Sequence, residues 1–168
     1  MCIRDSGDGS NSSSGRIVKM HKGEMTSTAS TSSQNYDIFN VNITPLAAGN
    51  WFYIHTNAYI SHTVSQSMYC QILIDNQYAG GRVGNSSDSS NTLSYFTESH
   101  ANNHRSYAAY NEYIAEYVHI HSGASAFNFK FRTRLQGGTQ YINYAASYDD
   151  AERGKPACRY HILEMEPS

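Results

Sequence analysis

The segment Phe127–Leu135 most constrains the fold of this chain, because its residues alternate between two kinds of side chain. Phe, Phe, Phe, Thr and Leu occupy every second position, and Asn, Lys, Arg and Arg occupy the positions between them. Side chains of a β-strand point alternately to its two faces, so the segment would have one aromatic face and one cationic or amide face. A helix would scatter the three Phe around its circumference. The pattern predicts a strand of an antiparallel sheet that covers a core on one side.

The same alternation recurs at short intervals along the chain, with turn residues between the segments. The longest example is Trp51–His62, in which Phe52, Ile54, Ala58 and Ile60 would share one face. Regular short strands separated by turns predict an all-β fold, an antiparallel β-sandwich of the jelly-roll type with about eight to nine strands. The other segments are residues 16–21, 39–44, 68–75, 92–96, 140–145 and 158–166.

Residues 111–121 fit a helix and a strand almost equally well. We expect a strand, because the segment is rich in aromatic and β-branched residues; a short helix over residues 107–112 stays open. Ser122-Gly123 then predicts a hairpin into the Phe127 strand. Gly137-Gly138 predicts a second hairpin, into residues 140–145.

The first residues of the chain need separate treatment. Residues 1–6 (Met-Cys-Ile-Arg-Asp-Ser) resemble the translated end of a sequencing-library adapter, which would make the chain a metagenomic fragment with its natural start elsewhere. We expect residues 1–14 to be scar and flexible, disordered linker, and residues 15–168 to form one domain. Cys70 and Cys158 lie in apolar strand patterns and predict two buried free thiols.

Charge and motifs narrow the function. The net charge is −2 with eight His, so the chain lacks the basic field that attracts nucleic acid. No apolar run approaches the roughly 20 residues of a membrane span, so no membrane insertion is expected. The sequence contains no nucleophile elbow, phosphate loop or zinc signature. We therefore expect no enzyme and no cofactor; catalysis, if present, would be that of a glycan-cleaving depolymerase.

Several short motifs occur in a familiar order. They are Val-Asn-Ile-Thr-Pro at residues 41–45, Ile-Leu-Ile-Asp at 72–75, Tyr-Ile-Asn at 141–143 and Ile-Leu-Glu-Met-Glu at 162–166. In this order the chain from residue 15 to 166 resembles the jelly-roll domains of bacteriophage tail fibres and other virion structural proteins. The resemblance implies a β-sandwich, usually trimeric and similar in outline to C1q/TNF-like domains. It also implies assembly in the host cytoplasm with other virion proteins, and display on the virion.

We therefore expect a non-enzymatic tail-fibre domain. The more specific form of this expectation is that the domain attaches to a host cell-surface glycan. The alternative is a stand-alone carbohydrate-binding module or a C1q-like secreted bacterial module. One loop has the composition most typical of a binding loop, because it combines amides, a cation and aromatic rings, as binding loops of other scaffolds do. It is formed by Asn102, Asn103, His104, Arg105 and Tyr107. A plain solvated loop is the competing interpretation.

His119 and His121 would place two imidazoles on one face of a strand, about 6.6 Å apart along it. Three such pairs around a threefold axis would offer six nitrogen ligands to a transition metal. The competing interpretation is two histidines on a solvated face or at a subunit interface.

Aromatic residues on strand faces that need not face the core favour self-association, because exposed apolar area of this kind is usually covered by another subunit. These residues are Trp51, Tyr53, Tyr59, Tyr113 and Tyr117. Together with the resemblance they predict a homotrimer. The alternative is that the Tyr hydroxyls simply reach water.

Overall fold

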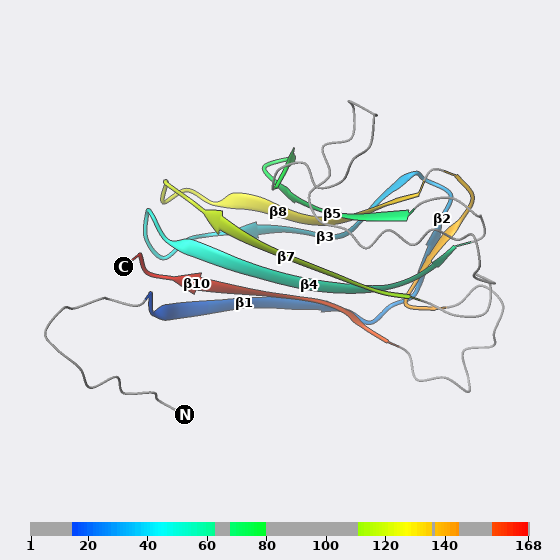
Figure 1. The fold of residues 1–168 in the computed structure, drawn as a ribbon, viewed down its shortest axis with the longest axis horizontal. Coiled ribbons are helices and arrows are strands. Elements are labelled where there is room, and N and C mark those ends of the chain that lie inside the picture. The colour runs from blue at the N-terminus through cyan, green and yellow to red at the C-terminus, as the bar shows by residue number, and fades with distance from the viewer. Residues whose placement is uncertain (1–14, 63–67, 80–110, 136, 145–155, 168) are drawn as a thin grey trace, which may run out of the picture.

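The structure is a computed structural model that describes residues 15–62, 68–79, 111–135, 137–144 and 156–167. Within these ranges it contains ten strands and no helix, arranged as two antiparallel sheets packed face to face (Figure 1). The predicted β-sandwich is confirmed. The described residues contain no helix, and therefore no helix that is long and apolar enough to cross a membrane.

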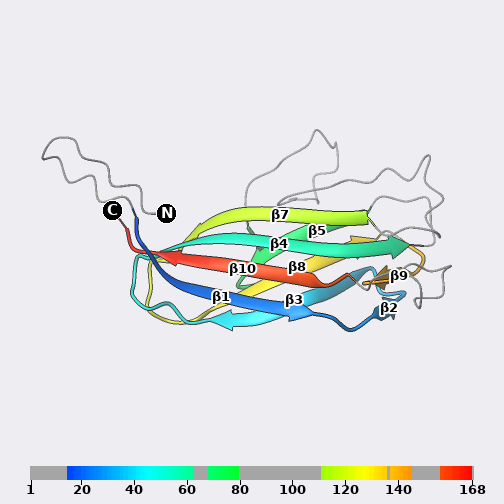
Figure 2. The ribbon, with the colours of Figure 1, turned by 90° about the horizontal axis from the view of Figure 1, so that it is seen from below.

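The larger sheet, sheet A, is built on the central strand β4. One edge of β4 pairs with β7 and the other edge with β10, which in turn pairs with β1 (Figure 2). Two short strands extend this sheet: β9 pairs with the last residues of β4 and also with β2. Because β9 lies beyond the end of β10, and β2 beyond the end of β1, we count β10 with β9, and β1 with β2, as one line of the sheet each. Sheet A therefore has four lines in the order β7, β4, β10, β1. The bounds are β1 Ile17–Met25, β2 Ala29–Thr31, β4 Trp51–His62, β7 Asn111–Ile120, β9 Gln140–Ile142 and β10 Cys158–Met165.

The smaller sheet, sheet B, has the order β3-β8-β5-β6. Its bounds are β3 Asn35–Ile43, β5 Met68–Ile74, β6 Gln77–Tyr78 and β8 Phe127–Leu135. In β8 the predicted alternation is fully confirmed: the three Phe, Thr133 and Leu135 are buried, and the residues between them are half-buried on the outer face.

Aromatic rings join the two sheets across the core. Tyr160 of β10 packs on Phe39 of β3 and Phe129 of β8, with ring centroids 5.0 Å and 5.5 Å away. At the other end, Phe52 of β4 meets Phe127 edge-on at 4.9 Å. Such edge-to-face pairs add to the stabilisation that burial itself provides.

The strand expected over residues 111–121 is confirmed as β7. The two predicted hairpins are wrong. β7 belongs to sheet A, β8 to sheet B and β9 again to sheet A, so both turns carry the chain across the sandwich. A hydrogen bond of 2.6 Å from the Thr133 hydroxyl to the Gln140 side-chain oxygen joins β8 and β9 inside the core.

Cys70 and Cys158 are buried free thiols, as expected. Cys158 donates to Asn143 Oδ1 at 3.0 Å, and the Asn143 amide donates to the backbone oxygens of Met25 and Ser27. Asn143 adopts the left-handed conformation, with φ of 62°. It therefore ties the break between β9 and β10 to the break between β1 and β2.

A buried carboxylate, Glu164 of β10, closes one end of the sandwich. One of its oxygens accepts the Leu46 backbone N–H at 2.6 Å and the Asn50 side-chain amide at 2.7 Å, and the other lies 3.1 Å from His21 Nε2. Burial raises the pKa of this carboxyl, but the donors, Asn50 foremost, outweigh it and hold the pKa below its ordinary value.

Candidate interaction surface

The predicted binding loop, Asn102, Asn103, His104, Arg105 and Tyr107, lies outside the described residues. Its role stays a prediction.

His119 and His121 lie on the core-facing side at the end of β7, with ring centroids 5.6 Å apart. Both rings pack on Phe127, at 4.8 Å and 5.0 Å. His121 Nε2 lies 2.9 Å from the Ser125 backbone oxygen, whereas His119 Nε2 is buried and has no hydrogen-bond partner. Burial, followed by the charge of His121, lowers the pKa of His119 and so favours its neutral form, which is the form that ligates metals.

The described residues contain no group of three or more His, Cys, Asp or Glu side chains that could hold a metal ion. Metal binding by the His119 and His121 pair stays a prediction. Elemental analysis of protein refolded with zinc or iron tests it, and a His119→Ala variant is the control. A stoichiometric metal that this variant loses would support the prediction; no bound metal in either protein would contradict it.

The outer face of sheet A carries the most unusual surface of the described part. The pairing of the four lines places their outward side chains in rows that run across the strands. The first two rows consist of large apolar or aromatic side chains, and we name them the apolar end. The first row is Ile120, Trp51, Met165 and Ile17, and the second is Val118, Tyr53, Leu163 and Met20.

The apolar end is open to solvent. Five of its eight side chains (Ile17, Met20, Trp51, Val118 and Ile120) are between 42% and 59% exposed. Scattered exposed apolar residues are ordinary, but a contiguous group marks a surface that contacts something else.

The third row is charged, and consists of Glu116, His55, His161 and Lys22. On the β7 side, Glu116 accepts hydrogen bonds from the Tyr53 hydroxyl at 2.7 Å and from His55 Nδ1 at 3.0 Å. These two donors, Tyr53 first, hold the pKa of Glu116 below its ordinary value, so the carboxylate is charged at neutral pH. Further along β7, Glu112 accepts from the Tyr59 hydroxyl at 2.8 Å.

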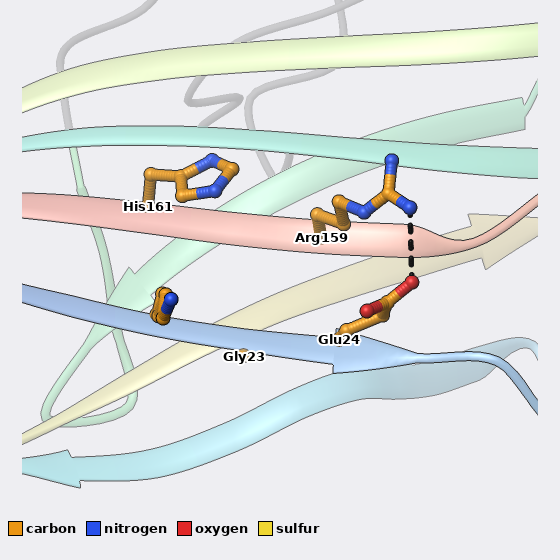
Figure 3. A pocket seen from close by; sticks show the side chains of 5 residues that line it. Gly23, Glu24, Arg159 and His161 are labelled. Carbon is orange, nitrogen blue, oxygen red and sulfur yellow. Dashed lines mark hydrogen bonds and ion pairs between the residues drawn. The ribbon is translucent and has the colours of Figure 1, made fainter.

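On the β1 side of the same face lies a pocket of about 330 Å³. Arg159 and His161 rise from β10 and Glu24 from β1, and an ion pair of 3.0 Å joins Arg159 to Glu24 (Figure 3). The pocket is lined by Lys22, Gly23, Glu24, Arg159 and His161. Two cations and a histidine against one carboxylate make it a place for an additional anionic group.

Gly23 allows β1 to lie close to β10 beside this pocket. It pairs with Tyr160, and a Cβ built on Gly23 would collide with the Tyr160 ring. The absent side chain therefore leaves the room that the buried tyrosine occupies.

The sequence anticipated this face only in part. Trp51, Tyr53 and Tyr59 project outward as expected, whereas Tyr113 is fully buried and Tyr117 packs against the core. The sequence did not predict the pocket between β1 and β10. Alternation along residues 158–166 puts Arg159 and His161 on one face, but no signal in the sequence says that β1 lies beside β10.

No family model and no curated protein matches the chain. Among solved structures, the chain is similar to one described as "EclA C-terminal domain; sugar-binding protein", with a TM-score of 0.41 and 10% sequence identity. The match covers 94% of this chain and 89% of that chain. Sugar binding is a property of that protein, and at this level of similarity it does not carry over to this chain.

Proposed function

We propose that this chain is a non-enzymatic structural domain of a bacteriophage tail fibre or related virion component, and that it works by presenting protein contact surfaces. The observation that carries the proposal is the apolar end, where aliphatic side chains dominate. Aliphatic side chains suit contact with another protein surface, whereas sugars are bound by flat aromatic rings together with polar groups. The order of motifs from residue 41 to residue 166 supports the virion setting.

Attachment to the host cell is the more specific form of this proposal. A cell-surface glycan is the expected ligand, and Asn103, His104 and Arg105 are the expected contacts. The test compares the wild-type chain with a triple alanine variant at these positions in binding to host cells and in a glycan array. The control is Thr44→Ala, at an exposed position elsewhere. Binding that only the triple variant loses supports attachment through this loop; binding that the triple variant keeps rules the loop out.

The pocket between β1 and β10 favours a second candidate, a stand-alone carbohydrate-binding or C1q-like secreted module. Its volume of about 330 Å³ falls at the lower end of the usual range for ligand pockets. Under this alternative, Arg159→Ala abolishes glycan binding while the triple loop variant keeps it. The two candidates therefore give opposite results in one glycan array.

A further inference from the structure

We infer that the outer face of sheet A is covered by a second copy of this chain, related to the first by a rotation axis that runs close to the strand direction between β4 and β10. The inference goes beyond the proposed function, because it names the partner and the residues that meet. It holds for a virion domain and for a free-standing one.

Such a rotation keeps every row at its own position along the strand direction and exchanges the two halves of the sheet. The β7–β4 half of one copy then faces the β10–β1 half of the other. In the first row, Trp51 comes opposite Met165 and Ile120 opposite Ile17. Apolar side chains therefore meet apolar side chains.

The second row behaves in the same way. Tyr53 comes opposite Leu163, and Val118 comes opposite Met20. All eight side chains of the apolar end acquire apolar partners, which is the self-complementarity that a symmetric interface requires.

The charged row supplies the complementarity that fixes the register. Glu116 of one copy comes opposite Lys22 of the other, beside the pocket that Arg159 and His161 also line. The carboxylate of Glu116 is the anionic group that this pocket can take up. An axis perpendicular to the strands that paired the first two rows with each other would leave Glu116 and Lys22 without partners in the other copy. Charge complementarity therefore selects the axis along the strands.

The area of the face is adequate only when the third row and a fourth row, which consists of Ile114, Asn57, Arg159 and Glu24, are included. Four lines about 4.8 Å apart and four rows about 7 Å apart give roughly 500 Å² in projection. Side-chain relief brings the accessible area toward the roughly 800 Å² per partner of a standard interface. The apolar end alone is about half the projected area, so rows three and four must contribute. Two twisted sheets stack in this way at about 30°.

The test measures the mass of the full chain in solution by light scattering and sedimentation equilibrium, at concentrations up to about 100 µM, where even micromolar affinity gives association. Wild-type chain at twice the single-chain mass of 18.7 kDa agrees with the inference, because only a rotation of 180° lays the whole face of one copy flat on that of the other. The homotrimer expected from the sequence, at three times this mass, would overturn the inference. A single-chain mass overturns the inference.

Variants show whether this face is the one involved. Val118→Asp places an unpaired charge opposite Met20 and should weaken association by about 100-fold or more. The matched control is Tyr78→Asp, which introduces the same charge at an exposed large side chain of β6, in sheet B and outside the rows. Circular dichroism confirms that both variants fold. Equal association of the two variants overturns the inference.

A charge exchange tests the register. Glu116→Lys and Lys22→Glu should each weaken association, and the double variant should restore it, because the opposed pair is rebuilt with reversed sign. A double variant no stronger than either single variant overturns the proposed axis. Mass is measured without any glycan or host cell, so failure here is distinguishable from failure of the proposed function.

Discussion

Glu164 gives the sharpest test of how this fold is held together. The perturbation is Glu164→Leu, which removes the acceptor from the buried Asn50 side-chain amide and from the part-buried Leu46 backbone N–H. Each buried donor left without a partner costs about 1–3 kcal/mol, so the free energy of unfolding should fall by about 4 kcal/mol. Glu164→Gln keeps an acceptor oxygen for these two donors but loses the charge assistance and the oxygen that faces His21, so the free energy of unfolding should fall by about 2 kcal/mol.

The control is Glu166→Gln, two residues further along the chain. Glu166 pairs with Arg16 at 3.2 Å, but the two side chains are 49% and 76% exposed. A surface pair of this kind contributes about 0.5 kcal/mol. Urea unfolding at pH 7, followed by circular dichroism, measures all three variants. If the free energies of unfolding of Glu164→Leu and Glu166→Gln differ by less than about 0.5 kcal/mol, the buried carboxylate does not stabilise the sandwich as argued.

The pH dependence gives an independent check on the same group. The folded pKa of Glu164 lies below its ordinary value of 4.5, so the unfolded chain takes up a proton there before the folded chain does. The stabilisation is complete above pH 4.5 and is lost as the pH falls through the folded pKa. The difference in stability between wild type and Glu164→Gln should therefore narrow below pH 4.5. A constant difference would mean that ionisation of this group does not matter.

Three further predictions concern other parts of the sandwich. Gly23→Ala should lower the free energy of unfolding by about 1–3 kcal/mol in a thermal melt, because its Cβ collides with the Tyr160 ring; an unchanged melt would contradict the packing described. Burial raises the pKa of Cys70 and raises that of Cys158 to about 11, so a thiol titration at pH 8 should count two more thiols in guanidinium than in the native state. Since burial lowers the pKa of His119, stability should fall as the pH drops below 6.5, and His119→Gln should lose that slope.

Which face of a strand is buried could be predicted from the sequence, because alternation is a local property. In β4 the apolar positions Phe52, Ile54 and Ile60 are fully buried. In β10 alternation alone does not decide the matter: Cys158 and Ile162 are fully buried, but so is Glu164, whereas Leu163 and Met165 lie on the outer face. Where one face is apolar and the other polar, as in β8, the buried face is visible in the residues themselves.

Which strands become neighbours could not be predicted in this way. Ser122-Gly123 and Gly137-Gly138 correctly mark reversals of the chain, but a reversal can lead back into the same sheet or across to the other. Both sheets offer the same apolar inner face, so hydrophobicity does not distinguish the two outcomes. The rows of the outer face depend on the pairing of β1 with β10 and of β10 with β4, which joins residues more than 100 positions apart. The apolar end and the pocket therefore became visible only in the assembled sheet.

The pairing of β1 with β10 also determines how the domain responds to mechanical force. The two strands run antiparallel, and the Glu166 backbone N–H donates to the Arg16 oxygen at 3.0 Å, so the first and last strands leave the sandwich at the same end (Figure 1). Tension between the two chain ends would separate β1 from β10 one hydrogen-bonded pair at a time, rather than shearing the whole ladder at once.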